Sequence, residues 1–168
     1  CRFESGFGHQ SSQQPPSPPV FQAARSYHSA SYPLTRSAMK FAIALFSPPH
    51  APSSRRALRF AEAVLAGGHE IVRLFLYQDA VQHASAALVL PQDETDGARQ
   101  WQTFISDNQL DAVVCIAAAL RRGVLNDEEA ARYDKPATVQ SQAWTLSGLG
   151  QLHEANQLAD RLICFGGP

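Results

Sequence analysis

The residue with the clearest chemical potential in this sequence is Cys115. It follows the apolar run Ala112–Val114 and stands directly before Ile116-Ala117-Ala118-Ala119-Leu120-Arg121-Arg122-Gly123. Because alanine and leucine favour a helix, the thiol is expected near the amino end of a short helix, where backbone N–H groups stabilise a thiolate. Arg121 and Arg122 add positive charge, and such settings lower the pKa of a cysteine below its usual value of about 8.5. The pattern predicts a thiol nucleophile; the alternative for a cysteine in an apolar strand is a small buried hydrophobe.

The other two cysteines lack such surroundings. Cys164 lies in the apolar run Leu162–Phe165, which predicts a buried strand position, and only Gly166-Gly167-Pro168 follows it. Cys1 begins a stretch without apolar periodicity. An odd number of cysteines in a chain with 45% hydrophobic residues argues against a disulfide framework and favours a reducing compartment. We therefore expect a cytoplasmic protein.

The loop sequences and the spacing of the histidines argue against nucleotide, metal and serine-hydrolase sites. The loop Ser47-Pro48-Pro49-His50-Ala51-Pro52 lacks the glycine pattern and the Lys-Ser/Thr pair of dinucleotide and nucleoside triphosphate sites. The six histidines lack the spacing of a metal site, and no Gly-x-Ser-x-Gly motif is present. A flavin mononucleotide site built on Ser47, Ser53 and Ser54 stays open as an alternative, and His50 is a weaker candidate in the same loop.

Charge and hydropathy disfavour two further classes of protein. The formal net charge is −1 and the pI is about 6.6, whereas phosphate recognition needs a clustered basic surface. We therefore expect no direct nucleic-acid binding. No stretch approaches the roughly 18 to 20 apolar residues that span a bilayer, so we do not expect this chain to be a membrane protein.

Helices and strands must position these residues, and the sequence after Met39 predicts where they lie. There, short apolar runs alternate with amphipathic segments. Predominantly apolar runs predict strands at 41–46, 71–77, 112–116 and 162–165. Amphipathic periodicity predicts helices from Ser53 or Ser54 to 66, at 95–107, from Asn126 and from Ser147 to 158, with 78–92 irregular. The alternation predicts an α/β protein with three layers: a mostly parallel sheet of about five strands with helices on both faces.

The chain divides at its only methionine. Residues 1–38 are rich in proline, serine and glutamine and lack apolar periodicity, which predicts a disordered extension or one translated from upstream sequence. Met39-Lys40-Phe41-Ala42-Ile43 then begins as α/β chains often begin, with a lysine before a buried strand. We therefore predict one domain at 39–168, with residues 1–38 dispensable.

From Met39 to Phe165 the sequence resembles the DsrE/DsrF-like family, and within it the TusD type of sulfurtransferase subunit. The most specific segment is Cys115-Ile116-Ala117-Ala118-Ala119-Leu120-Arg121-Arg122-Gly123-Val124. Other matching segments are Met39-Lys40-Phe41-Ala42-Ile43, Gly67-Gly68-His69-Glu70, Phe75-Leu76-Tyr77, Thr145-Leu146-Ser147-Gly148-Leu149-Gly150-Gln151-Leu152 and Asp160-Arg161-Leu162-Ile163-Cys164-Phe165. The loop Pro48-Pro49-His50-Ala51-Pro52 departs from the family, where a glycine-containing stretch is expected.

The resemblance implies that Cys115 accepts sulfur as a persulfide from a TusA-like donor and passes it to a TusE-like acceptor. This relay 2-thiolates the wobble uridine of tRNA. The resemblance also implies assembly with TusB-like and TusC-like sister subunits into a heterohexamer, a dimer of heterotrimers, and it implies no metal or organic cofactor. Leu88, Leu125 and Tyr133 are candidate positions for subunit contacts.

Two alternatives stay open within the same fold. A DsrE-like carrier in sulfur oxidation would use the same cysteine for a different pathway. A non-catalytic interaction subunit would lack the transfer cysteine, so the presence of Cys115 in its expected context favours the carrier.

Overall fold

The computed structural model describes residues 37–89, 91, 93–139 and 143–167. Cys1 and nearly all of the predicted extension at 1–38 lie outside the described residues. The described elements, in chain order, are β1 (Lys40–Leu45), α1 (Pro52–Ala66), β2 (Glu70–Leu76), the 3₁₀ helix η1 (Gln78–Ala84), α2 (Gly97–Asp107), β3 (Ala112–Cys115), α3 (Ile116–Leu120), α4 (Asp127–Tyr133), β4 (Thr145–Ser147), α5 (Gly150–Leu158) and β5 (Arg161–Phe165).

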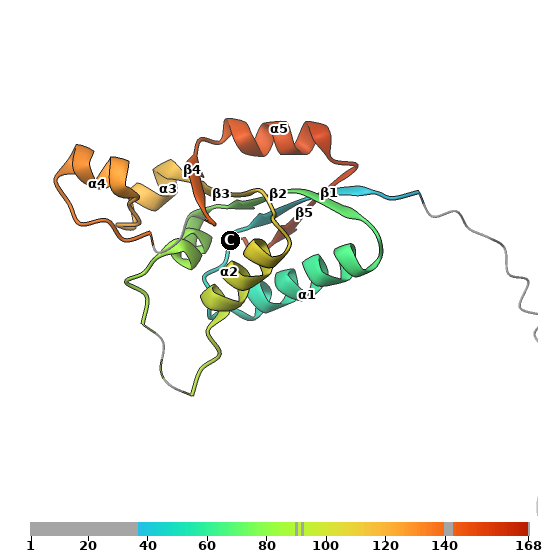
Figure 1. The fold of residues 1–168 in the computed structure, drawn as a ribbon, viewed down its shortest axis with the longest axis horizontal. Helices are drawn as coiled ribbons and strands as arrows, with labels where there is room; N and C mark the ends of the chain where they lie inside the picture. Colours follow the sequence, from blue (N-terminus) through green and yellow to red (C-terminus); the bar gives the residue numbers. More distant parts are fainter. Residues whose placement is uncertain (1–36, 90, 92, 140–142, 168) are drawn as a thin grey trace, which may run out of the picture. The chain divides into compact units, whose positions relative to one another are not determined.

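The strands form a single parallel sheet in the order β4-β3-β2-β1-β5. Figure 1 shows α5 on one face of this sheet and α1 and α2 on the other. The predicted three-layer α/β fold is therefore confirmed, and the described sheet is entirely parallel. In such a sheet the carboxyl ends of all strands meet at one edge, which is where sites in this class of fold gather.

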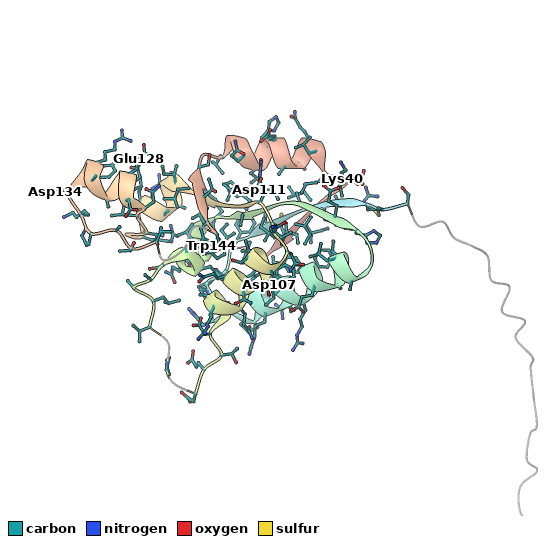
Figure 2. The ribbon with its side chains drawn as sticks, in the orientation of Figure 1. Lys40, Asp107, Asp111, Glu128, Asp134 and Trp144 are labelled. Carbon is teal, nitrogen blue, oxygen red and sulfur yellow. The ribbon has the colours of Figure 1, made fainter. Side chains whose placement is uncertain are left out.

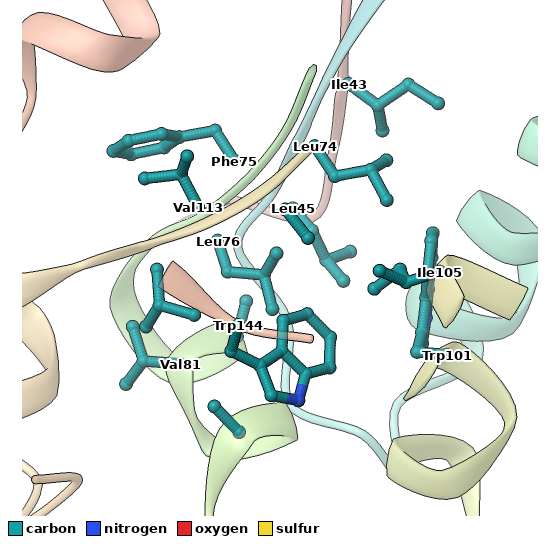
Figure 3. Packing of buried hydrophobic residues seen from close by; sticks show 14 of the residues in the cluster. Ile43, Leu45, Leu74, Phe75, Leu76, Val81, Trp101, Ile105, Val113 and Trp144 are labelled. Carbon is teal, nitrogen blue, oxygen red and sulfur yellow. The ribbon is translucent and has the colours of Figure 1, made fainter. Parts of the chain in front are cut away.

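The core lies between the sheet and α1 and α2. Ala42–Leu45 of β1 and all of β3 are buried, because strands covered on both faces need apolar side chains on both. Figure 3 shows Leu74, Leu76 and Leu45 packed near Trp101 and Ile105 of α2. Burying a side chain of this size stabilises the fold by about 1.5–3 kcal/mol.

The starts of three helices can be compared with the sequence through their caps. Asn126 caps α4 by accepting a hydrogen bond from the backbone N–H of Glu129 (3.0 Å), as predicted. Asp96 caps α2 in the same way. The predicted cap of α1 by Ser53 or Ser54 is wrong: Ala51 holds the cap position, Pro52 begins the helix, and Ser54 points into the core.

Two segments differ from the prediction. Residues 78–84, expected to be irregular, form η1, with Ala80, Val81, His83 and Ala84 buried. Ser147, expected to start the last helix, ends β4, and the helix begins only at Gly150.

Among the described residues, no helix combines the length and the apolar character that crossing a membrane would require.

Candidate functional site

Cys115 is the last residue of β3 and the residue immediately before α3. Its backbone is extended (φ −62°, ψ 112°), so the chain turns from strand to helix at this residue. The register of the sheet pairs it with Ser147, the last residue of β4. The predicted short helix after the thiol is confirmed. The thiol, however, is not accessible: Cys115 is only 1% exposed and belongs to the hydrophobic core.

The turn that ends α3 depends on Gly123. The N–H of Val124 donates to the carbonyl of Ala119 (3.0 Å), and the N–H of Gly123 donates to that of Leu120 (3.2 Å). This is the bond pattern of a Schellman motif, which needs a residue in the left-handed region, and Gly123 has φ +69°. Thr138 reinforces the turn by donating to the carbonyl of Gly123 (2.7 Å). The sequence thereby holds a five-residue helix at a fixed place after the cysteine.

The two arginines after α3 do not act together on the thiol. The Arg122 guanidinium donates to Asp79 Oδ1 from Nε and Nη2, both at 2.8 Å, and to the carbonyl of Ala118 from Nη1 at 3.3 Å. Arg121 is exposed and lines a cavity of about 590 Å³ together with residues that include Leu120, Leu125, Tyr133 and Lys135. The structure therefore places Arg122 against η1 rather than against Cys115.

The proposed subunit-contact positions differ in exposure. Tyr133 is 50% exposed beside this cavity, with the Arg132 guanidinium 5.7 Å from its ring centre. Leu125 is buried, and Leu88 is half-buried. Tyr133 alone among the three is therefore a surface position in this chain. Figure 2 shows α4, with Glu128 and Asp134, at the opposite end of the sheet from Lys40.

A buried polar network that no sequence pattern indicated lies next to η1. His83 Nδ1 lies 2.8 Å from the carbonyl of Ala80, and its Nε2 lies 2.8 Å from Ser54 Oγ. Trp101 Nε1 donates to the same Ser54 Oγ at 3.1 Å. Because a carbonyl only accepts, Nδ1 carries the proton and Nε2 accepts from the Ser54 hydroxyl, so the imidazole is neutral.

The surroundings of His83 explain its charge state. Burial lowers the pKa of His83 from 6.5 to about 4, against the opposing effect of the bond to Ala80, and His50 lowers it further. Every polar atom of the triad Ser54, His83 and Trp101 has a partner, which is the condition under which burying such groups is tolerated. The network ties η1 to α1 and α2. It is therefore a structural anchor with a neutral histidine at physiological pH.

The remaining candidate residues lie elsewhere. Cys164 is exposed on β5, so its predicted burial is wrong. The reason is that β5 is an edge strand, paired only with β1. His50 is exposed beside Arg55, Asp93 and Glu94, and no described contact joins it to Cys115.

Within the described ranges, no group of three or more histidine, cysteine or carboxylate side chains is arranged to hold a metal ion. At the carboxyl edge of the sheet, Cys115 holds a thiol at the junction of a central strand and a helix. A thiolate there can attack an electrophilic sulfur once it becomes accessible. The contacts that sequence reasoning missed join residues far apart in the chain. Asp79 pairs with Arg122, 43 residues away, and the hydrogen bonds of Ser54 to His83 and to Trp101 span 29 and 47 residues, so none of them leaves a local signal.

Comparison with known proteins gives a consistent result. The model of the DsrE/DsrF-like family matches residues 39–165. A Pseudomonas aeruginosa protein named "Sulfurtransferase TusD homolog" is 68% identical over 129 residues, which cover 77% of this chain and 98% of that protein. The protein named DsrE in Allochromatium vinosum is 43% identical over 129 residues, covering 76% of this chain and 99% of its own length. "Sulfurtransferase TusD" of Salmonella arizonae is 38% identical over 128 residues, which cover 76% of this chain and all of that protein.

A solved structure shares the fold. The crystal structure of the ychN protein from E. coli superposes with a TM-score of 0.58, covering 77% of this chain and all of that one. The two sequences are 18% identical, so the likeness supports the parallel α/β architecture and nothing finer.

Proposed function

Because this chain belongs to the DsrE/DsrF-like family, we propose that it is a sulfurtransferase subunit that carries sulfur as a persulfide on Cys115. The observation that carries the proposal is the position of Cys115, at the carboxyl end of a central parallel strand and directly before α3, within a chain 68% identical to a relative named as a TusD homologue. In α/β sheets of this type, reacting groups gather at that edge.

The transfer consists of two balanced thiol exchanges. In the first, the Cys115 thiolate attacks the outer sulfur of a donor persulfide, the donor's sulfur–sulfur bond breaks, and the donor leaves as a thiolate. Cys115 then holds the outer sulfur as its own persulfide. In the second, an acceptor thiolate attacks that outer sulfur and releases the Cys115 thiolate. No electrons are gained or lost overall, and the rates depend on the thiolate fraction and on access.

We place this carrier in the relay that 2-thiolates the wobble uridine of tRNA, with a TusA-like donor and a TusE-like acceptor. The support is the naming of the relatives from Pseudomonas and Salmonella. TusB-like and TusC-like sister subunits complete the proposed heterohexamer, and the cytoplasm is the proposed compartment because thiol exchange needs reduced cysteines. Arg121 and Arg122 are proposed as supporting residues, Arg122 through its contact with η1.

The functional unit of this proposal is residues 39–168. The family match begins at residue 39, and the three relatives above are covered over 98% of their length or more. Residues 1–38 are proposed to contribute nothing to sulfur transfer.

The second candidate function is that of a DsrE-like carrier in sulfur oxidation. The 43% identity to the Allochromatium vinosum protein named DsrE favours it, and the same thiol exchanges on Cys115 would serve it. The two functions differ in the final acceptor. Removing the protein from its cell abolishes the 2-thio group of wobble uridine in the first case and leaves it intact in the second.

The direct test is sulfur loading of purified protein. The full chain is incubated with cysteine, a cysteine desulfurase and a TusA-like carrier, and its intact mass is measured. A mass gain of one sulfur atom is expected for the wild type and for Cys164→Ser, and none for Cys115→Ser. Loading of the Cys115→Ser variant would overturn the assignment of the sulfur-carrying residue.

A further inference from the structure

The burial of Cys115 conflicts with its proposed reaction. An exchange between thiols needs the attacking sulfur to approach along the sulfur–sulfur bond, so both groups must meet directly. Cys115 is 1% exposed, whereas Cys164 is exposed. Some element covering the carboxyl end of β3 must therefore move before sulfur can be taken up.

The element in the right place is η1. It follows β2, the neighbour of β3, and it packs against both β3 and α3, the two elements that meet at Cys115. Val81 of η1 is fully buried, and Figure 3 shows it beside the end of β2 near Leu76 and Trp144. The short helix thus covers the edge of the sheet at which the cysteine lies.

The two ends of η1 are attached in different ways. In its first turn, Asp79 pairs with Arg122, the residue two positions after α3, and both side chains contact solvent (56% and 28% exposed). At the other end, His83 is held inside the protein by Ser54 of α1, which also accepts from Trp101 of α2. The first attachment is a partly hydrated ion pair, and the second is fully buried.

The connection from β2 to η1 is also unusual. Gln78, the first residue of η1, has φ +51°, in the left-handed region that residues with a Cβ seldom adopt. Such a conformation costs free energy, and it persists here because the contacts of η1 hold it. A change of this one backbone angle would relieve the strain and move the residues of η1 relative to β2.

We propose that η1 is a cover over Cys115 that is latched by the Asp79–Arg122 ion pair and anchored by His83. Release of the ion pair lets the Asp79 end lift, and the thiol then becomes accessible from the side of α3. The inference rests on the proposed function, because it supplies the access that sulfur transfer at Cys115 needs. It also gives Arg122 a positioning role that acts through Asp79 rather than on the thiol.

The size of the effect follows from the type of contact. Partly exposed ion pairs contribute little free energy, so loss of this one is expected to raise the open fraction about two- to fivefold. Alkylation of a thiol that is reached only in an open state follows that fraction when opening is fast. Added salt screens exposed charges and is expected to act in the same direction.

The experiment measures alkylation of each cysteine in the full chain by iodoacetamide at pH 7.5, resolved by peptide mass spectrometry. In the wild type, Cys115 is expected to react at least about tenfold more slowly than Cys164, which serves as an internal reference. Asp79→Asn and Arg122→Gln are each expected to speed Cys115 about two- to fivefold without changing Cys164. Because both substitutions remove the same ion pair, the double variant should exceed neither single variant.

The two substitutions also distinguish release of a cover from a direct effect of their charges on the thiolate of Cys115. Removing the negative Asp79 favours a nearby thiolate, whereas removing the positive Arg122 disfavours it. A charge effect alone would therefore change the Cys115 rate in opposite directions, while release of a cover changes it in the same direction. The matched control is Asp111→Asn, which removes a comparable ion pair to Arg73 (2.7 Å) just before β3, at the other edge of the sheet.

Three results would overturn the latch: equal rates for Cys115 and Cys164 in the wild type, no acceleration in either variant, or acceleration in only one of them. Should one variant unfold, which circular dichroism reports, the other still tests the pair. No sulfur donor is present in this experiment. If both variants speed the alkylation of Cys115 but the protein takes up no sulfur, the proposed function is refuted and the cover is supported. If the protein takes up sulfur but neither variant speeds alkylation, the cover is refuted and the proposed function is supported.

Discussion

The carboxyl ends of β3 and β5 present the same residue type in opposite surroundings. Each strand carries a cysteine, Cys115 as the last residue of β3 and Cys164 as the second-last residue of β5. β3 lies between two strands and continues into a helix, and its cysteine is buried. β5 is an edge strand followed by Gly166 and Gly167, and its cysteine is exposed.

The contrast between Cys115 and Cys164 indicates that the exposure of a cysteine does not by itself decide whether it carries sulfur. An exposed thiol on an edge strand meets every oxidant and small thiol in solution, whereas a covered thiol meets only what opens the cover. A carrier that must hand sulfur to one acceptor gains from the second arrangement. The proposed sulfur carrier is therefore Cys115, the less exposed of the two cysteines. Its position at the junction of β3 and α3 distinguishes it from Cys164.

The largest expected effect is on sulfur transfer in the cell. Cys115→Ser is expected to abolish the 2-thio group of wobble uridine, because a serine hydroxyl has no appreciable alkoxide population at neutral pH and cannot hold a persulfide. Cys164→Ser is expected to leave it intact. The measurement is the retardation of the relevant tRNAs on a mercury-containing gel. Normal retardation with Cys115→Ser, or its loss with a folded Cys164→Ser, would reverse the roles of the two cysteines.

The second effect is a loss of stability in acid that arises from His83 of η1, which packs against β3. The pKa of His83 is about 4 in the folded protein and 6.5 in the unfolded chain, so the unfolded chain binds the proton more readily. The stabilisation is fully present above pH 6.5 and is lost as the pH falls towards 4. The expected loss between pH 7 and 4.5 is about 2–3 kcal/mol.

Urea denaturation at pH 7 and pH 4.5 measures this loss, with His83→Gln as the reference. The variant is less stable at pH 7 but lacks the titrating group, so its stability should fall less between the two pH values. An equal fall in both proteins would mean that His83 does not carry the acid sensitivity.

The third effect compares the stability of the two cysteine variants. Cys115→Ser places a hydroxyl in the core and is expected to cost about 1–3 kcal/mol if the hydroxyl finds no partner. Cys164→Ser changes an exposed residue and is expected to cost about 0.5 kcal/mol or less. The sequence alone predicts Cys164→Ser to be the more costly change, because it places a hydroxyl in a strand whose apolar run predicts burial. Thermal melts of both variants decide the order, and a more costly Cys164→Ser would contradict the exposure of β5.

The smallest effect is expected from removing the residues that precede β1. Deletion of residues 1–38 should leave the melting temperature and the assembly with TusB-like and TusC-like subunits unchanged. Met39 and Lys40 keep their backbone bonds to His69 (3.2 Å) and Asp160 (2.8 Å) in the shortened chain. A clear drop in melting temperature, or loss of assembly on gel filtration, would show that the deleted residues stabilise the domain.

The strands and long helices could be predicted because their signals are local. Residues 41–45 of β1 and all of β3 are continuously apolar, and the apolar stripe of α1 recurs at helical spacing. The cap at Asn126 is local in the same sense. These features depend on residues within a turn or two of each other, so the sequence specifies them directly.

The parts that could not be predicted depend on distant neighbours. β4 has three residues and exists through its pairing with β3, and η1 has no apolar period of its own. Ser54 satisfies local rules for a cap, yet tertiary contacts with His83 and Trp101 turn it inward. The position of Cys115 in the chain was predictable, but its burial and the exposure of Cys164 follow from the strand order of the sheet.

The most direct measurement locates the transferred sulfur in the unmodified protein. The full wild-type chain is loaded from a persulfide donor, digested without reducing agent, and each cysteine-containing peptide is examined by mass spectrometry. The extra sulfur is expected on the peptide that contains Cys115, although that thiol is the covered one, and the Cys164 peptide should stay unmodified. Sulfur on Cys164 with none on Cys115 would show that exposure, rather than the β3–α3 junction, decides which thiol reacts.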